Sequence, residues 1–414
     1  MRVLHITTHA FGGAGEAALR VHNGLLRRDV DSRLFCLSKK CDEPAVEAFG
    51  RSGFLYDLLF RLKHKLKSKL NVVNKDYYFF DSGVYAIESF RGLEGVIQRF
   101  EPDRVILYWV SGFISPRVIG ELCSQRNISV YWYLTDMAPL TGGCHYAWDC
   151  DGYERSCGKC PALGARREND ISSTTLQAKR HYISNSPLKI LSPNKFMTEQ
   201  VRKSAVMSGQ LVREIPFGVD SSFFSLGDRK SFRAELGLPS ERSIIFFGAS
   251  DLREKRKGFA YLKDALIEYV GRSGTRPLLC LAGDGPSVDL DLNVETISFG
   301  KVTYDVLHKL YGAADVVAIP SVEDSGPLMT SEVLMTGTPI VAFKIGTAVD
   351  LVTKGVGYVA NLRDVRDFAY GLDSILSLKP LEYEQLSSRC REFALQRYEE
   401  NVVITKLMES LAEG

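Results

Sequence analysis

Two acidic residues in the last third of the chain have a spacing that suits shared chemistry. Asp324 and Glu332 stand eight positions apart, Gly326-Pro327 follows the first acid, and Gly337 lies beyond the second. The apolar run Asp315–Ile319 predicts a strand just upstream, so Asp324 should lie in the loop that leaves this strand and Glu332 on the helix that follows. Ligands of open parallel sheets bind outside the carboxyl ends of the strands. Carboxylates there can accept hydrogen bonds from hydroxyl groups, and the start of the helix offers N–H groups to an anion.

A second candidate is the basic loop that follows the predicted strand Arg242–Phe247. It carries Arg253 and the run Lys255-Arg256-Lys257, which ends at Gly258. Fixed cations lower the barrier of a reaction in which negative charge develops on a leaving phosphate group. The alternative is an ordinary basic loop whose charges only face water.

Glycines mark a third candidate, close to the N-terminus. The predicted strand Arg2–Thr7 leads into Gly12 and Gly13, and Glu16 follows within the next predicted helix. A glycine-rich turn between strand and helix lets backbone N–H groups approach a phosphate. The pattern is not a Gly-x-Gly-x-x-Gly fingerprint, and a plain tight turn with positive φ is the alternative.

Composition limits the class of protein. A chain of 414 residues is long enough for two domains, and 45% hydrophobic with 25% charged residues is typical of a soluble globular protein. The net charge of +2 gives no argument for a nucleic acid partner. No apolar run reaches the roughly 18 residues of a membrane span, and the first residues lack the pattern of a signal peptide. We therefore expect a cytoplasmic protein, with its nine cysteines reduced or bound to metal rather than paired in disulfides.

Strand-like and helical patterns alternate twice along the chain, which predicts an α/β fold in two domains. We expect domains at 1–192 and 193–385, followed by helices over 386–414. The expected strands of the first domain are Arg2–Thr7, Ser32–Leu37, Arg104–Trp109, Ser129–Leu134 and Leu188–Leu191. Those of the second are Arg242–Phe247, Pro277–Ala282, Thr296–Phe299, Asp315–Ile319 and Pro339–Phe343.

The acid pair, the basic loop and the glycine turn together resemble the motifs of retaining glycosyltransferase family 4. Pro216-Phe-Gly-Val-Asp220 and Gly283-Asp-Gly-Pro286 are similar to further turns of that family. The family usually has Glu at the position of Asp324. The resemblance implies two Rossmann-like domains (the GT-B fold) facing a central cleft, with the last helix crossing back to the first domain. It also implies retaining transfer of a sugar from a UDP- or GDP-sugar to a glycan or lipid-linked glycan, in surface polysaccharide biosynthesis, without a catalytic cofactor.

The resemblance also implies roles for individual residues. The catalytic residues would be Asp324, Lys257 and an arginine of the basic loop, taken as Arg253 with Arg256 as the alternative. The donor-binding residues would be Gly12, Gly13, Lys257, Val302, Asp324, Gly326, Pro327, Leu328 and Glu332. The resembled family often has His where this chain has Thr135, so we expect Glu16, Thr135, Asp136 and His145 to line the acceptor side.

Four cysteines gather in the segment 141–162: Cys144, Cys150, Cys157 and Cys160. The Cys157-x2-Cys160 spacing is common among zinc ligands, and four thiolates complete a tetrahedral site. Reduced thiols or a loop disulfide are the alternatives. The segment resembles a Cys-rich insertion in polysaccharide-assembly members of the family.

Residues 54–70 have leucines at helical spacing, with Arg61, Lys63, Lys65, Lys67 and Lys69 among them. Such a helix suits an anionic membrane surface, which would place the protein at the inner face of the membrane. The alternative is a surface helix with its apolar side in the core. For the whole chain, two further readings stay open: a catalytically silent nucleotide-binding or scaffold protein, and a nucleotide-sugar epimerase of the same fold.

Overall fold

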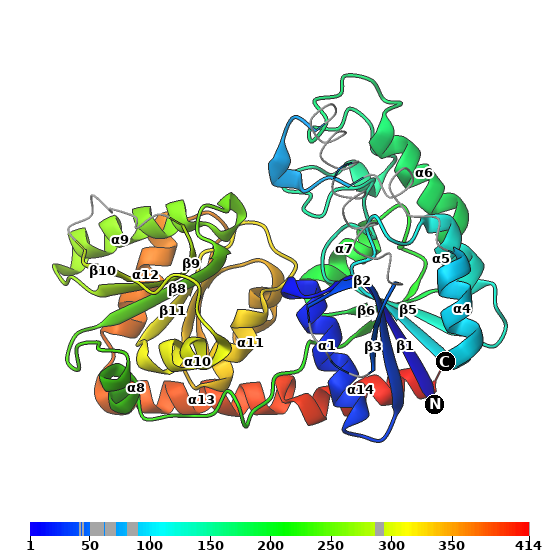
Figure 1. Ribbon diagram of the computed structural model, residues 1–414. Coiled ribbons are helices and arrows are strands. Elements are labelled where there is room, and N and C mark those ends of the chain that lie inside the picture. Colours follow the sequence, from blue (N-terminus) through cyan, green and yellow to red (C-terminus); the bar gives the residue numbers. More distant parts are fainter. Residues whose placement is uncertain are drawn as a thin grey trace. The chain divides into compact units, whose positions relative to one another are not determined.

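The computed structural model describes residues 1–40, 43, 45–49, 62, 72–80, 90–285 and 294–413. The chain forms two compact units, the first from Met1–Phe217 with Ile404–Gly414 and the second from Gly218–Val403. Each unit contains one parallel sheet with helices lying against it (Figure 1). The prediction of two Rossmann-like α/β domains is confirmed.

The first sheet has the strand order β3-β2-β1-β4-β5-β6-β7, and every neighbouring pair is parallel. Strand β1 is buried along almost its whole length, as expected for a parallel strand covered on both faces. The strands are β1 Arg2–Ala10, β2 Asp31–Lys39, β3 Val46–Ala48, β4 Arg104–Leu107, β5 Ser129–Tyr133, β6 Lys189–Ser192 and β7 Leu211–Glu214. The helices are α1 Gly12–Leu26, α4 Phe90–Phe100, α5 Pro116–Cys123, α6 Ile171–Ile183 and α7 Lys195–Lys203, with short 3-10 turns η1 Lys75–Tyr77 and η2 Gly152–Glu154.

The second sheet has the order β10-β9-β8-β11-β12-β13, also with parallel neighbours throughout. The strands are β8 Ile244–Asp251, β9 Leu278–Asp284, β10 Thr296–Ser298, β11 Val316–Ile319, β12 Ile340–Phe343 and β13 Gly357–Ala360. The helices are α8 Arg229–Glu235, α9 Phe259–Ser273, α10 Tyr304–Ala313, α11 Leu328–Met335, α12 Val365–Leu376 and α13 Pro380–Tyr398, with 3-10 turns η3 Lys255–Lys257 and η4 Gly346–Leu351.

Both sheets reverse their strand order beside their first strand. In the first unit the reversal lies between β1 and β4, and in the second it lies between β8 and β11. Loops leaving two such strands diverge to opposite faces of the sheet and open a crevice at the carboxyl edge, where α/β proteins bind ligands. The loops after β1 and β4, and those after β8 and β11, are therefore the places to examine for chemistry.

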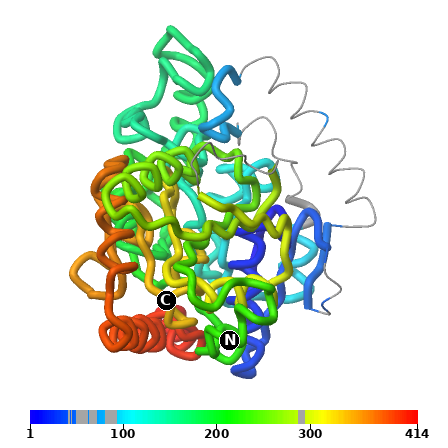
Figure 2. Tube along the Cα trace, turned by 90° about the vertical axis from the view of Figure 1, so that its left-hand side faces the viewer, coloured from blue at the N-terminus to red at the C-terminus, as the bar shows by residue number. Residues whose placement is uncertain are grey.

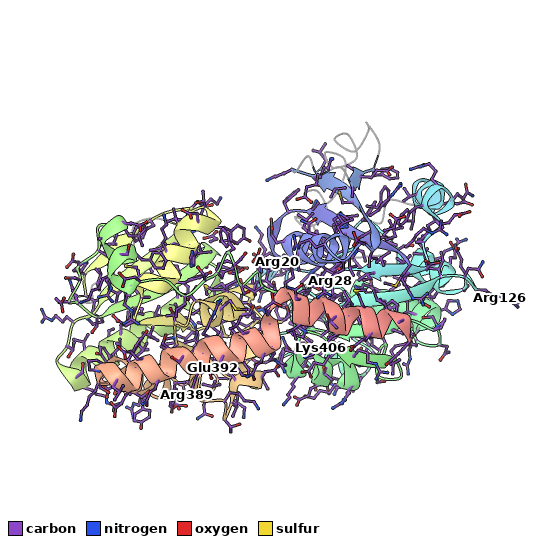
Figure 3. The ribbon with its side chains drawn as sticks, turned by 90° about the horizontal axis from the view of Figure 1, so that it is seen from below. Arg20, Arg28, Arg126, Arg389, Glu392 and Lys406 are labelled. Carbon is purple, nitrogen blue, oxygen red and sulfur yellow. The ribbon has the colours of Figure 1, made fainter. Side chains whose placement is uncertain are left out.

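The first unit extends further along the chain than the predicted division at 192/193. Strand β7 pairs with β6 from Lys189↔Leu211 onward, so the first sheet is complete only after residue 214. The last helix, α14 Glu400–Ala412, supplies Ile404–Gly414 to the same unit. Arg104 Nε donates to Leu411 O at 2.7 Å and Tyr131 OH to Ser410 O at 3.2 Å. Arg28, which follows α1, donates from Nη2 to Thr405 Oγ1 of α14 at 3.4 Å, and Figure 3 labels Arg28 and the neighbouring Lys406.

A loop-rich region of the first unit joins the segments 72–80 and 141–165, which lie side by side in both Figure 1 and Figure 2. Phe79 and Cys144 form an antiparallel bridge, and Val73 N donates to Ala162 O at 2.9 Å. Lys179 of α6 is buried beneath this region and donates to Ala138 O and Thr141 O at 2.5 and 2.7 Å. The loop that follows β5 has little regular secondary structure, and these hydrogen bonds hold it in place.

Candidate functional site

In the second unit, two cations converge on one carboxylate at the point where the strand order reverses. Lys257 Nζ lies 2.6 Å from Asp324 Oδ2, and Arg256 Nη1 lies 2.8 Å from the same oxygen. The cations come from η3 after β8, and Asp324 comes from the loop after β11. The side chain of Asp324 is only 7% exposed. The basic loop and the first acid, which the sequence offers as two separate candidates, are therefore joined by direct ion pairs.

Gly258 sets the position of the basic loop. Its φ is +73°, and a Cβ atom there would lie 1.7 Å from Pro320 O, so another residue would collide with the end of the β11 segment. Val322 N donates to Arg256 O at 2.8 Å, which joins the two loops through their main chains. The cations are thus held against Asp324 by backbone contacts rather than by side-chain packing alone.

The structure places Arg256, not Arg253, beside the acid. Arg253 is exposed and forms a bidentate ion pair with Asp251, two positions earlier. Its Nε lies 2.8 Å from Oδ1 and its Nη2 lies 2.9 Å from Oδ2. Arg256 also binds Glu254, with Nε 2.7 Å from Oε1. The reason is the 3-10 turn η3, which directs the side chains of Arg256 and Lys257 towards the β11 loop. Of the two arginines that the sequence leaves open, the geometry therefore favours Arg256 over Arg253 for the position beside the acid.

The ionisation of this cluster is set by burial and by mutual attraction. Burial opposes the charge on Asp324, but the nearby Lys257 and Arg256 outweigh it and hold the pKa of the carboxyl below its usual value. Burial lowers the pKa of Lys257, Arg256 lowers it further, and Asp324 opposes both effects. Two cations and two carboxylates balance in this cluster, because Glu254 pairs with Arg256. An arriving anion would compete with Asp324 for cations that already face it.

The second predicted acid, Glu332, lies on α11 and is only 3% exposed. Tyr311 OH donates to its Oε2 at 3.2 Å, a partner 21 residues away that no sequence pattern indicates. Pro327 precedes α11, and no side chain caps the helix, so its first N–H groups point out of the helix start. Gly326, with φ +133°, donates its N–H to Asp324 Oδ1 at 3.0 Å. Leu328 begins the helix. The run Gly326–Glu332 therefore leads from the loop of the first acid into α11, which carries the second acid.

The other donor-side residues lie at strand ends. Val302 follows β10 in a turn that joins β9 through the bond from Gly283 N to Gly300 O, 2.8 Å long. Gly12 and Gly13 are exposed and form the first turn of α1, where Gly12 has φ +72°. The sequence predicted them in a turn before the helix, but the helix begins at Gly12 itself.

The first unit carries a different kind of cluster after β4 and β5. Asp136 and His145 are 7% and 4% exposed, and their Oδ2 and Nδ1 atoms lie 2.9 Å apart. Trp109 Nε1 lies 2.8 Å from His145 Nδ1 and 3.4 Å from Nε2. Asp136 also accepts the N–H of Ala138 at 2.7 Å. The two residues expected to line the acceptor side are thus buried and bonded to each other, while Thr135 is half-buried and Glu16 lies on α1, also half-buried.

The four cysteines are free thiols in the loop region between β5 and α6. A hydrogen bond from Cys144 is the main cause that lowers the pKa of Cys160 to about 7, against the effect of burial. Burial raises the pKa of Cys157 to about 11 and that of Cys150 above its usual value. Across the described residues, which include all four cysteines, no three or more His, Cys, Asp or Glu side chains are placed to hold a metal ion. The present arrangement does not fit the zinc site, which stays a prediction without geometric support.

Comparison with known proteins agrees with this geometry. Residues 241–377, which contain the whole ion cluster and Glu332, match the family model of glycosyl transferases group 1. An uncharacterized glycosyltransferase of Methanocaldococcus jannaschii is 26% identical over 219 residues, 50% of this chain and 55% of that protein. A D-inositol 3-phosphate glycosyltransferase of Segniliparus rotundus is 34% identical over 149 residues, 33% of this chain and 32% of that protein. The chain therefore spans between a third and about half of the length of these relatives.

Solved structures share the fold of the whole chain. Sucrose-phosphate synthase from Thermosynechococcus elongatus superposes with a TM-score of 0.70 at 16% identity, covering 100% of this chain and 99% of that one. Anabaena HepE in complex with UDP gives a TM-score of 0.66 at 16% identity, with 100% of both chains covered. The chain has the GT-B fold, and its second unit matches the glycosyl transferases group 1 family over residues 241–377.

Proposed function

We propose that this protein is a retaining glycosyltransferase that moves a sugar from a nucleotide-sugar donor to a glycan or lipid-linked glycan acceptor. The observation that carries the proposal is the convergence of Lys257 and Arg256 on Asp324 at the strand reversal of the second sheet. Cations that are buried together with an acid at a ligand-binding edge suit an anionic donor that carries hydroxyl groups.

Different residues of this site would bind the diphosphate, the ribose and the sugar of the donor. Its diphosphate would take Lys257, Arg256 and the N–H groups at the start of α11, while Glu332 would bind ribose hydroxyls and Asp324 the sugar. In the reaction the bond between the anomeric carbon and the diphosphate oxygen breaks, and the oxygen of an acceptor hydroxyl bonds to that carbon from the same face. The hydroxyl proton passes to the departing diphosphate oxygen. Negative charge grows on the leaving diphosphate, so fixed cations stabilise the transition state more than the ground state.

The donor nucleotide is proposed from the relatives and structural neighbours, and the location of the reaction from the sequence. The relatives named above are glycosyltransferases, and HepE has been solved with UDP and with UDP-glucose, so UDP is the first donor nucleotide to test and GDP the second.

We place the reaction in the cytoplasm, in surface polysaccharide assembly. None of the helices that the structure describes has the length and apolar character needed to cross a membrane. The predicted membrane-contact helix 54–70 lies outside the described residues apart from Leu62, which is exposed.

Nucleotide binding tests the proposal directly. Isothermal titration with UDP, GDP and ADP should show one nucleotide that binds wild-type protein and binds Lys257→Ala at least about tenfold more weakly, because a charged hydrogen bond contributes roughly 1.5–3 kcal/mol. Lys255→Ala is the matched control, since Lys255 is exposed on the same turn. Equal affinities of the two variants would reject the assignment of Lys257.

Turnover then separates the enzyme from its alternatives. Wild-type protein with the sugar nucleotides of the preferred base should slowly release the free nucleotide. Binding without any release would favour a silent nucleotide-binding protein, and conversion of one sugar nucleotide into its epimer would favour an epimerase.

A further inference from the structure

An aromatic cluster surrounds Trp109 where the strand order of the first sheet reverses. His9 from the end of β1 is tilted against the indole, with ring centroids 5.3 Å apart, and Phe11 stacks on His9 at 5.0 Å. Phe80 meets Trp109 edge-to-face at 5.7 Å and 88°. Trp109, Phe11 and Phe80 are each only half-buried. Aromatic surface is thus gathered at the edge where an α/β sheet binds ligands and is not fully used in the core.

The orientation of Trp109 is fixed by a chain of hydrogen bonds. When Asp136 is ionised, it accepts a proton held on His145 Nδ1, at 2.9 Å. Trp109 Nε1 is closer to Nδ1, at 2.8 Å, than to Nε2, at 3.4 Å. A protonated Nδ1 cannot accept a hydrogen bond, however, so the lone pair that remains for the indole N–H is the one on Nε2. Asp136 thereby selects the tautomer of His145 that accepts from Trp109. Because Asp136 and His145 are almost fully buried, these hydrogen bonds reach the indole N–H from the interior of the unit.

Further aromatic rings continue the surface around the same loops. Tyr78 and Tyr146 form an edge-to-face pair with centroids 5.6 Å apart, and Tyr78 is 46% exposed. Tyr146 follows His145 directly, and Tyr78 stands two residues before Phe80. Near Trp109, the buried carboxylate of Asp136 accepts hydrogen bonds from His145 and from Ala138 N, so its oxygens are already satisfied within the protein. The aromatic surface itself favours a neutral ligand that has an apolar side.

We propose that Trp109 is a stacking platform for a pyranose ring of the acceptor, with Asp136 and His145 as positioning residues that orient it. A pyranose presents axial C–H groups on one face, whose partial positive charge suits the negative face of an indole. This assignment rests on the proposed function for its biological meaning, because it names a glycosyl residue as the acceptor group. In this proposal Asp136 and His145 act on the acceptor through Trp109, whereas the family resemblance places them on the acceptor side directly.

The test is ¹⁹F NMR of the full chain labelled with 5-fluorotryptophan. The protein has three tryptophans, and Trp109→Phe and Trp148→Phe assign their signals. Methyl glycosides of glucose, galactose, mannose and N-acetylglucosamine are titrated into the tens of millimolar. We expect at least one to move the Trp109 signal saturably while the signal of Trp148, half-buried in the same unit, stays in place. No movement with any glycoside, or equal movement of both signals, would overturn the proposal.

A second variant tests the positioning chain. Asp136→Asn keeps the shape of the side chain but no longer selects the Nδ1–H tautomer, so the indole should lose its fixed orientation. We expect the Trp109 signal to broaden or split without sugar, and the glycoside dissociation constant to rise about three- to tenfold, with an unchanged melting temperature. An unchanged signal and affinity would remove the positioning role.

Uridine is the control for a different ligand. If uridine moves the Trp109 signal as strongly as the best glycoside, the surface stacks a nucleobase and the pyranose assignment is wrong. The UDP titration of the second unit is independent of this outcome. If UDP binds normally but no glycoside moves the ¹⁹F signal of Trp109, only the stacking role of Trp109 is rejected. If no nucleotide binds at all, the proposed function is rejected.

Discussion

Mild acid should destabilise the first unit through a buried histidine. His22 on α1 has no exposed surface, and its Nδ1 lies 2.7 Å from Ser32 Oγ. Within the described part of the chain, its Nε2 is buried without a hydrogen-bond partner. Protonation would therefore place a charged donor where nothing accepts it. Burial accordingly lowers the pKa of His22 to about 4, and burial and the neighbouring His22 lower the pKa of His5 well below its usual value.

The direction and size of the effect follow from linkage. The unfolded chain binds a proton at His22 with a pKa of about 6.5, while the folded unit binds it only near pH 4. Between these values the unfolded state holds more protons, so stability is complete above about pH 6.5 and falls as the pH drops towards 4. At 1.36 kcal/mol per pKa unit, the full effect is about 3 kcal/mol, of which about 2 kcal/mol is lost by pH 5. His5 adds to the loss in the same direction.

Tryptophan fluorescence isolates the unit concerned, because Trp109, Trp132 and Trp148 all lie in the first unit. Urea unfolding at pH 7.5 and pH 5 should give wild-type free energies that differ by at least about 2 kcal/mol. His22→Leu should remove about 2 kcal/mol of that difference, and His22→Gln serves the same purpose if the leucine variant does not fold. His181→Gln, which changes an exposed histidine on α6, should leave it intact. A His22 variant with the wild-type pH dependence would refute the reasoning.

Two further predictions concern the basic loop and the cysteines. Gly258→Ala should lower the melting temperature of the second unit and weaken nucleotide binding, because φ +73° and the contact with Pro320 O forbid a Cβ; normal melting and binding would show that the loop tolerates a shift. In wild-type protein, alkylation of Cys160 by iodoacetamide, followed by mass spectrometry, should rise with pH around a midpoint near 7. Cys144→Ala removes the thiol that donates to Cys160, so the midpoint should move upward; an unmoved midpoint would contradict that hydrogen bond.

The sequence predicts the inner strands of both sheets and the edge strand β10, but it misses the other three edge strands, β3, β7 and β13. Strand β11 is a continuous apolar run and β8 begins with one, which is the pattern of central parallel strands, whereas β1 is buried although threonines and histidines stand among its apolar residues. Strand β7, by contrast, is exposed or half-exposed along Leu211–Glu214, so its residues carry no core pattern. Its place is set by pairing with β6, which a single sequence does not display. The domain boundary shifts for the same reason.

The candidate site divides in a similar way. The places of Asp324 in a loop and Glu332 on a helix follow from spacing, because a loop and the first turns of a helix after a strand have fixed positions relative to the sheet edge. Lys257 is indicated by the resemblance to the family motif. The choice between Arg253 and Arg256 depends on the φ of Gly258 and on the turn it allows, which composition does not reveal. The bond between Trp109 and His145 joins residues 36 positions apart through an irregular loop. No periodic pattern in the sequence marks such a contact.

The ion cluster of the second unit is better explained by a ligand than by stability. Burying Lys257, Arg256 and Asp324 requires their removal from water, and the attraction between them often only balances that cost. Apolar residues of similar size would fill the same space at least as well. Glu254 adds a fourth charge, and Gly258 adds a backbone conformation that other residues resist. The second unit holds other ion pairs that include a buried side chain, Arg233 with Asp315 and Arg397 with Asp350. Of these three, only the cluster of Lys257, Arg256 and Asp324 lies at the carboxyl edge of the reversal between β8 and β11, where a bound anion would use its charges.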